Sequence, residues 1–257
     1  MEPYINLDQI QQILQSFAPI TLEEMDGVQL MNRTDTKFIL SRKDFEEILG
    51  NLPDDYRVLE INGNRQSRYE TLYYDTPEFR HYLAHQNGKK TRWKIRKRKY
   101  VESNLSFLEI KFKNNGGRTI KSRIKLDEFD TTLNERCCRF IDSKNLQSQT
   151  LEPKLINTFR RITLVNKTIP ERVTIDIDVA FQNHGKNVSL RHLVIAEVKQ
   201  ENVNRHTAFM RLVKQRIIRP EGVSKYCLGV ALIYPQIKSN TFKEKILKIN
   251  KLEKSYA

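Results

Sequence analysis

The chain has 257 residues, which is long enough for one domain with a sizeable hydrophobic core. Its 45 lysines and arginines outnumber its 31 acidic residues, and the formal charge of +14 favours polyanionic partners such as nucleic acid, anionic lipid or phosphorylated small molecules. The cysteines, Cys137, Cys138 and Cys227, form no Cys-x-x-Cys pair and no Cys/His cluster, which excludes a structural zinc site and favours a reducing compartment.

No stretch of the sequence has the pattern of a targeting or membrane segment. The N-terminus, MEPYINLDQIQQILQ, is polar and acidic, whereas a signal peptide has a basic start followed by an apolar run. No apolar run approaches the length of a transmembrane helix. The sequence therefore predicts a soluble, cytoplasmic protein.

The N-terminal region is predicted to form a helix and then a charged strand. Apolar residues at helical spacing predict an amphipathic helix over residues 7–17. In the stretch 30–40, Arg33, Asp35 and Lys37 alternate with small threonines, so this strand carries its charges on one face.

Capping signals predict the start of two further helices. Ser41, with Asp44 three residues later, has the pattern of a capping box. After an aromatic strand over residues 68–75, residues 76–78 (Thr-Pro-Glu) read as an N-cap, a first-position proline and a first-turn acid. A second helix is therefore predicted from there to Gly88.

The most basic segment, residues 92–100 (RWKIRKRKY), is predicted to be a strand. Lys94, Arg96 and Arg98 would project from one face, and the other face, which carries Lys97, is predicted to lie in solvent. A half-buried strand normally packs an apolar face, so the shared face of the first three cations indicates a polyanionic ligand.

Residues 107–126 are predicted to form a β-hairpin around residues 114–117 (Asn-Asn-Gly-Gly), which tolerate the positive φ of tight turns. Each strand of the hairpin has an apolar side and a charged side. The charged residues on those sides are Glu109, Lys111, Lys113, Lys121, Arg123 and Lys125.

The C-terminal half repeats the pattern. An aromatic and basic segment spans residues 151–164, and two alternating strands follow over residues 172–179 and 194–200. The first of these is predicted to alternate strictly, with Asp178 on its charged face and Val179 on its apolar face. Two helices, over residues 205–217 and 223–233, and a lysine-rich tail complete the chain.

At least five predicted strands have one apolar and one charged side. This pattern favours an α+β fold whose sheet curls into a barrel or tunnel. The alternative is an antiparallel sheet with its charges in solvent. A tunnel lined by like charges would be unstable when empty, and bound phosphate and metal would relieve the repulsion.

Other chemistry has little support in the sequence. His81 and His85 lie four residues apart, but the glutamate of an H-E-x-x-H metal site is missing. There is no P-loop, no G-x-S-x-G and no dinucleotide-binding G-x-G-x-x-G.

Eight segments, in order, resemble the VTC domain, the vacuolar-transporter-chaperone type of polyphosphate polymerase. The resemblance runs from about residue 23 to residue 235, and the segments are RTDTKFIL, ETLYYDTPEFRHYL, KIRKRKY, LEIKFK, TIKSRI, ERVTIDIDVAF, IAEVKQ and SKYCLGVAL. Because that family is part of the triphosphate tunnel superfamily, the resemblance implies an antiparallel β-barrel tunnel flanked by helices. It divides the chain into an N-terminal helix (1–20), a tunnel domain (21–236) and a basic tail (237–257).

The chain departs from the hydrolase and cyclase branch of that superfamily, the CYTH proteins. Those proteins begin with Glu-x-Glu-x-Lys, whose carboxylates help to hold a metal, whereas this chain has Arg33-x-Asp35-x-Lys37. A cation in place of a carboxylate favours a longer polyanion over triphosphate hydrolysis.

The resemblance implies transfer of the γ-phosphoryl group of ATP to a growing polyphosphate chain, with Mn²⁺ or Mg²⁺ as the cofactor. The expected partners are ATP, polyphosphate and a membrane protein that takes up the product; nucleic acid is not expected.

The implied catalytic residues are Arg96, Arg98, Lys111, Arg161 and Arg172. Lys37, Lys121 and Lys225 are implied phosphate ligands, and Lys94, Arg123 and Lys199 on charged strand faces complete the predicted substrate-binding set. Glu197 is the implied metal ligand, with Asp176 or Asp178 assisting through water. The family commonly has a lysine where this chain has Gly222, and Lys199 or Lys214 is expected to compensate.

Three alternatives stay open at this point. The chain could be a triphosphatase of the CYTH type, or a non-catalytic module that binds polyphosphate or inositol phosphates. Nucleic-acid binding has the least support, because only Trp93 and Tyr100 flank the basic strand as stacking platforms.

Overall fold

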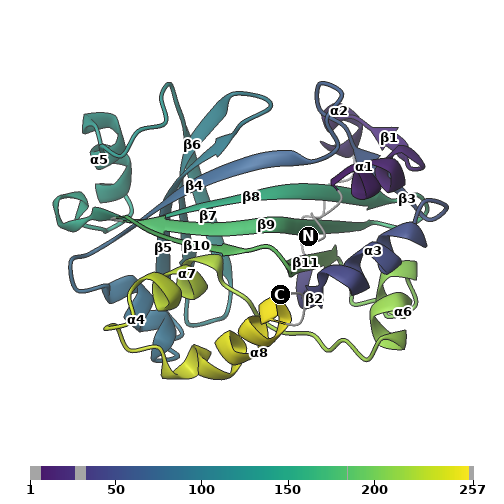
Figure 1. Cartoon of the computed structure of the whole chain (residues 1–257). Coiled ribbons are helices and arrows are strands. Elements are labelled where there is room, and N and C mark those ends of the chain that lie inside the picture. Colours follow the sequence, from purple (N-terminus) through teal and green to yellow (C-terminus); the bar gives the residue numbers. More distant parts are fainter. Residues whose placement is uncertain (1–6, 27–32, 184, 255–257) are drawn as a thin grey trace.

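The structure is a computed structural model that describes residues 7–26, 33–183 and 185–254 (Figure 1). Residues 30–32 of the predicted first strand lie outside these ranges. The strands are β1 (Ala18–Ile20), β2 (Thr34–Ser41), β3 (Tyr56–Leu59), β4 (Ser67–Asp75), β5 (Arg92–Tyr100), β6 (Leu105–Lys113), β7 (Thr119–Leu126), β8 (Glu152–Asn166), β9 (Glu171–Asn183), β10 (Lys186–Leu190) and β11 (Leu193–Gln200). The α-helices are α1 (Leu7–Gln15), α2 (Leu22–Asp26), α3 (Arg42–Gly50), α4 (Arg80–Gln86), α5 (Glu135–Asp142), α6 (Ala208–Gln215), α7 (Lys225–Ile233) and α8 (Lys243–Lys254).

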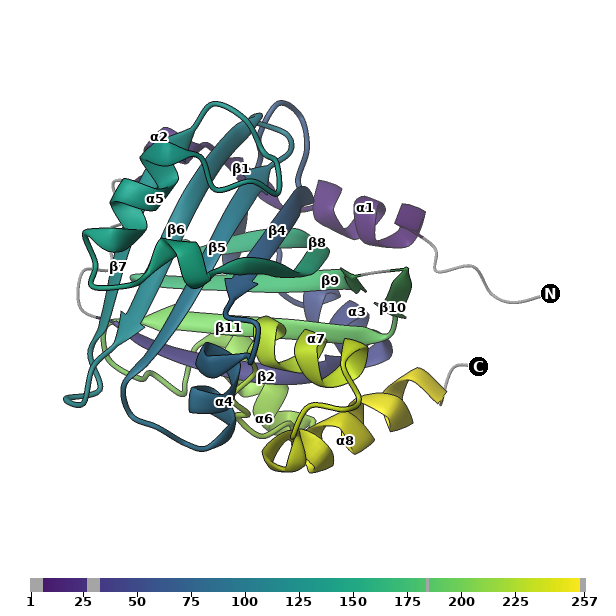
Figure 2. The same ribbon diagram turned by 90° about the vertical axis from the view of Figure 1, so that its left-hand side faces the viewer.

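The sheet follows one antiparallel path, in the order β2-β11-β9-β8-β4-β5-β6-β7. Outside this path, β10 pairs with β9, β3 pairs with β8, and the short β1 lies parallel to β3. Figures 1 and 2 show β5 and β6 crossing β9 and β11 steeply, so that the sheet curls around an inner face. Over the described residues, β2 and β7 do not pair, so the curled sheet stays open along one side. The predicted α+β class with an antiparallel, tunnel-like sheet is confirmed.

Two hydrophobic cores cover the outer face of the sheet. Helices α1, α3 and α6 pack over β2, β11, β9 and β8, where Phe38, Ile175 and Phe209 are buried. Helix α5, which the sequence analysis did not predict, packs over β4, β5 and β6 and buries Ile95 and Ile141. Burial of this apolar area is the main favourable term in folding the sheet.

Lys97 is part of the second outer core, so the prediction that it lies in solvent is wrong. Its side chain is only 2% exposed, and its ammonium group pairs with Asp130 at 2.5 Å and donates to the carbonyl oxygen of Thr132. A buried ammonium needs such partners because its desolvation is costly. Alternation placed Lys97 on the correct face, but the loop that covers it comes from a distant part of the sequence.

The inner face of the sheet is divided into a charged half and an apolar half. Helices α4, α7 and α8 fill the apolar half, packing against Ile39, Ile195 and Phe181. Gly229 of α7 lies so close to the strands that a Cβ there would be 2.4 Å from Leu155 and 2.5 Å from Phe181. Helix α7 therefore lies directly against β8 and β9 and closes one end of the concave space.

A bulge at Asp178 sets the boundary between the two halves on β9. Asp178 has φ of 52°, and the pairing of β8 with β9 shifts register between Thr158 and Arg160. As a result Val179 belongs to the inner core beneath α7, whereas Ile177 belongs to the outer core. The prediction of strict alternation through residue 179 is therefore wrong, because one extra residue reverses the direction of the side chains that follow.

The predicted capping signals have different outcomes. Ser41 caps α3 by accepting a hydrogen bond from the Asp44 amide, as predicted. Helix α4 begins at Arg80 rather than at residue 76, and Phe79 before it has φ of 57°. The buried carboxylate of Asp75 accepts hydrogen bonds from the amides of His81 and Tyr82, and the hydroxyl of Thr76 accepts one from the amide of Arg80, so Asp75 shares the capping role predicted for residues 76–78.

Part of the predicted basic tail is ordered against the inner core. Helix α8 buries Ile249, and Phe242 in the preceding 3₁₀ turn is buried in the same cluster. The predicted domain boundaries at residues 20 and 236 stay predictions. None of the described helices combines the length and apolar character needed to cross a bilayer.

The close contact at Gly229 leads to a stability prediction. Substitution of Gly229 by alanine forces a methyl group into the packed side chains of Leu155 and Phe181 and should lower the free energy of unfolding by about 1–3 kcal/mol. Urea denaturation measures the change. Gly50→Ala, where a Cβ meets no atom within 4 Å, is the control and should cause no loss. Equal stability of the two variants would contradict the close packing of α7.

Candidate functional site

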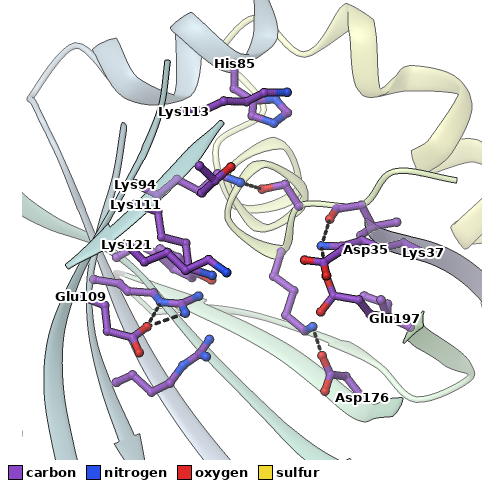
Figure 3. Close-up of a pocket in the computed structure, with 18 of the residues that line it drawn as sticks. Asp35, Lys37, His85, Lys94, Glu109, Lys111, Lys113, Lys121, Asp176 and Glu197 are labelled. Carbon is purple, nitrogen blue, oxygen red and sulfur yellow. Dashed lines mark hydrogen bonds and ion pairs between the residues drawn. The ribbon is translucent and has the colours of Figure 1, made fainter. Parts of the chain in front are cut away.

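The charged half of the inner face encloses a cavity of about 490 Å³. Its lining includes twelve lysines and arginines and four carboxylates, which gives a formal charge of +8. The charged side chains come from β2, β5, β6, β7, β8, β9 and β11 and from the N-terminus of α7, so distant segments converge on one space. Figure 3 shows two walls facing each other, with Lys94, Lys111 and Lys121 on one side and Lys37, Asp176 and Glu197 on the other.

The cationic wall is formed by β5, β6 and β7. Lys94 lies opposite Lys111 in the register of β5 and β6, and Lys111 lies opposite Lys121 in the register of β6 and β7. Burial lowers the pKa of Lys94 to about 8. The charge of Arg96, followed by burial, lowers the pKa of Lys111 well below its usual value. These shifts mean that the cationic wall is short of negative charge.

One carboxylate stabilises the centre of the cationic wall. Glu109 lies opposite Arg96 and accepts hydrogen bonds from its Nε at 2.7 Å and its Nη2 at 2.5 Å. Burial opposes ionisation of Glu109, but Arg96 and Arg98 outweigh it and hold the pKa of Glu109 at about 2. The guanidinium of Arg96 is therefore fixed in one orientation, with its remaining donors available to a ligand.

The mixed wall is formed by β2, β8, β9 and β11 and alternates cations with carboxylates. The carboxylate of Glu197 lies 3.1 Å from Lys37 Nζ and 3.0 Å from Lys199 Nζ. Burial would raise the pKa of Glu197, but the two lysines, with Arg161, lower it strongly. Glu197 is therefore ionised throughout the physiological pH range.

Asp176 is the second carboxylate of the mixed wall. It accepts hydrogen bonds from Arg161 at 2.6 and 2.8 Å, and it also pairs with Lys225 at the start of α7. Burial would raise the pKa of Asp176, but these two cations lower it strongly. Asp176 thus holds one residue of β8 and one of α7 in the same place, which the sequence analysis did not predict.

An aromatic pair lies beside three of these cations. The rings of Tyr69 and Phe159 stack with a centroid separation of 5.0 Å. The guanidinium carbons of Arg98 and Arg161 and the ammonium of Lys225 lie 4.6–5.8 Å from one or both ring centroids. Cation–π attraction of this kind holds the cations in position without neutralising them. The aromatic character of both strands was visible in the sequence, but their pairing was not.

Ten of the twelve predicted site residues line the cavity. These are Lys37, Lys94, Arg96, Arg98, Lys111, Lys121, Arg161, Glu197, Lys199 and Lys225. Arg123 is exposed and stacks on Phe107 at 4.6 Å, and Arg172 donates to the carbonyl oxygen of Met25. Asp178, a predicted assistant to the metal, pairs instead with Arg42 and Arg160. Lys214, on α6, is also outside the cavity lining.

The cavity residues fit a divalent metal only in the presence of phosphate. Within the described ranges, no cluster of three or more histidine, cysteine or acidic side chains has metal-binding geometry. Mg²⁺ is commonly held by one or two carboxylates together with substrate phosphates and water. Glu197 can supply such a carboxylate, provided that phosphate oxygens take over the lysines that now pair with it.

The excess positive charge predicts strong stabilisation by a polyphosphate ligand. Tripolyphosphate at about 100 times its Kd should stabilise the fold by about 2.7 kcal/mol and raise Tm by about 5–10 °C. Differential scanning fluorimetry measures the shift, with sodium chloride at equal ionic strength as the control. The Lys111→Ala variant should show a smaller shift, and Arg123→Ala the wild-type shift. Equal shifts with both salts would contradict a specific polyanion site.

The lowered lysine pKa values predict that anion binding weakens as the pH rises. Lys94 has a pKa of about 8 in the unliganded protein, and a bound anion raises it, so binding above pH 8 takes up protons. Affinity for sulfate, whose own charge does not change in this range, should fall between pH 7.5 and 9.5. Calorimetry in buffers with different ionisation heats measures the proton uptake. Lys94→Met should reduce the uptake, and an unchanged value would contradict the assignment.

The family model described as VTC domain matches residues 32–234. No curated protein matches the chain. A putative adenylate cyclase from Bacillus halodurans is 12% identical, with a TM-score of 0.49 and coverage of 76% of this chain and 96% of that chain. A putative adenylyl cyclase from Hippeastrum, described as having a dominant triphosphatase activity, is 14% identical, with a TM-score of 0.48 and coverage of 78% and 96%.

A putative adenylate cyclase from Vibrio parahaemolyticus is 15% identical, with a TM-score of 0.44 and coverage of 78% of this chain and 99% of that chain. The family match extends over most of the chain and includes all ten predicted residues that line the cavity. The protein therefore belongs to the VTC domain family.

Proposed function

We propose that the protein transfers the γ-phosphoryl group of ATP to the end of a polyphosphate chain. The observation that carries this proposal is the cavity with a formal charge of +8, on which cations of seven separate elements converge. Such a space is suited to an extended, densely charged anion and unsuited to a neutral ligand. Membership of the VTC domain family supports the same substrate class.

The cavity has the side chains that phosphoryl transfer requires of a protein. Catalysis of this kind depends on positioning and on neutralising charge, because a terminal phosphate is already a nucleophile. Arg96, Arg98 and Arg161 supply planar guanidinium groups that bind two phosphate oxygens at once. Each is held by a neighbour of its own. Arg96 pairs with Glu109, Arg161 pairs with Asp176, and Arg98 Nε donates to the hydroxyl of Thr71. The three arginines can therefore hold donor and acceptor phosphates in line.

A divalent metal is part of the proposal. When bound, Mn²⁺ or Mg²⁺ would offset the negative charge that develops on the phosphates during transfer. Glu197 would hold the metal, since its carboxylate faces the cavity and remains ionised. Lys37 and Lys199, which pair with Glu197 in the absence of substrate, would then turn to phosphate oxygens.

One observation favours a second candidate, a module that binds polyphosphate without turnover. The carboxylates Glu109, Asp176 and Glu197 are all paired with cations of the cavity, which is an arrangement suited to holding arginines and lysines in place. In that case the cavity would bind the chain, and ATP would not be consumed.

Product analysis separates these functions. The purified protein should convert ATP and Mn²⁺ into phosphate polymers, seen as a ladder on a gel stained for polyphosphate. Release of orthophosphate or pyrophosphate without a ladder would identify a triphosphatase instead. Tight binding of polyphosphate without ATP turnover would identify the binding module.

Glu197→Gln tests the metal ligand. The substitution should lower ATP-dependent synthesis by about 100-fold or more, because it removes the charge that holds the metal. Circular dichroism should show an intact fold. Arg118→Ala, in the exposed turn between β6 and β7, is the control and should keep the wild-type rate. Unchanged synthesis by Glu197→Gln would remove this residue from the mechanism.

A further inference from the structure

The segment from Glu221 to Lys225, here called the bridging segment, runs along the open side of the sheet. The amide of Glu221 donates to the carbonyl oxygen of Lys37 at 2.7 Å, so this segment lies against β2, the strand at one end of the sheet path. In return, Lys37 Nζ lies 3.4 Å from the carbonyl oxygen of Val223. The bridging segment therefore covers part of the free edge of β2, the edge that does not pair with β7.

The other end of the bridging segment reaches across the cavity. Ser224 accepts a hydrogen bond from Lys94 Nζ of the cationic wall at 2.9 Å, and Lys225 pairs with Asp176 of the mixed wall. Both residues line the cavity, together with Val223. The bridging segment is thus the part of the chain where the two walls meet.

Helix α8 holds this segment from outside the cavity. Lys248 pairs with Glu221 at 2.7 Å, Lys245 lies 3.8 Å from the same carboxylate, and Lys245 also donates to the carbonyl oxygen of Gly222. Neither lysine lines the cavity. In Figure 1 the chain between α6 and α7 passes beside α8.

The helix is itself firmly anchored, so it can act as a support. Ile249 is fully buried in the inner core. Near its C-terminal end, the Glu253 carboxylate accepts hydrogen bonds from the amides of Arg191 at 3.1 Å and His192 at 2.9 Å. Helix α8 therefore spans from the turn between β10 and β11 to the bridging segment.

We propose that α8 positions the bridging segment through Lys245, Lys248 and Glu221, and so sets the affinity of the cavity for its polyanionic ligand without touching that ligand. The inference rests on the proposed function only in that the cavity binds phosphate chains. The physical reason is entropic. The residues before α7 have no regular secondary structure. Because α8 already holds the anion-binding groups of this segment in place, less conformational entropy is lost when the anion binds.

The test compares two lysines of the same helix. Lys248→Met removes the contact with Glu221, whereas Lys251→Met removes the same charge from an exposed position of α8. Calorimetry should give a Kd for tripolyphosphate raised about three- to fivefold in Lys248→Met and unchanged in Lys251→Met. Lys248→Arg, which keeps the ion pair, should retain the wild-type Kd. Glu221→Gln, which loses the ion pairs with both Lys245 and Lys248, should raise the Kd about tenfold.

Scanning fluorimetry without ligand distinguishes positioning from general destabilisation. Under the proposal, Lys248→Met and Lys251→Met have the same unliganded Tm and differ only in Kd. Equal Kd values for these two variants, with normal binding by the wild type, would overturn the inference and leave the proposed function intact. Absence of tripolyphosphate binding by the wild-type protein would instead overturn the proposed function.

Discussion

Repulsion among the cations on the inner face is the constraint on which the rest of the structure depends. Two like charges about 4 Å apart repel by about 4 kcal/mol at the effective dielectric of a protein surface, and twelve lysines and arginines line the cavity. The carboxylates of Glu109, Asp176 and Glu197 offset part of this repulsion. The stacked rings of Tyr69 and Phe159 make cation–π contacts with three of the cations. The remaining excess of positive charge is the physical basis of the proposed polyanionic ligand.

The apolar half of the inner face makes that charged half possible. Helix α7 packs against β8 and β9 through Gly229, and the bulge at Asp178 turns Val179 and Phe181 toward it. The two halves are thus neighbours on the same strands, one stabilised by burial and the other held in shape by ion pairs. The N-terminus of α7 is the junction, since Ser224 and Lys225 contact opposite walls.

Much of the site was predictable because alternation on a strand is a local property. Lys94, Arg96 and Arg98 share a face in the sequence and line one cavity in the structure. Where alternation failed, the cause lay outside the segment. The bulge at Asp178 depends on the pairing of β9 with β8, and the burial of Lys97 depends on Asp130 and the loop around it. Pairing and burial are set by contacts between distant residues, which no single segment reveals.

The sequence by itself determined the charged and apolar faces of the strands and most of the charged residues that line the cavity. Tertiary structure decided which charges are paired. Asp176 joins Arg161 to Lys225, 64 residues apart in the chain, and Glu221 joins β2 to the C-terminal helix. Side-chain direction follows from the backbone of a strand alone, whereas an ion pair exists only where the curled sheet and its helices bring two segments within a few ångströms.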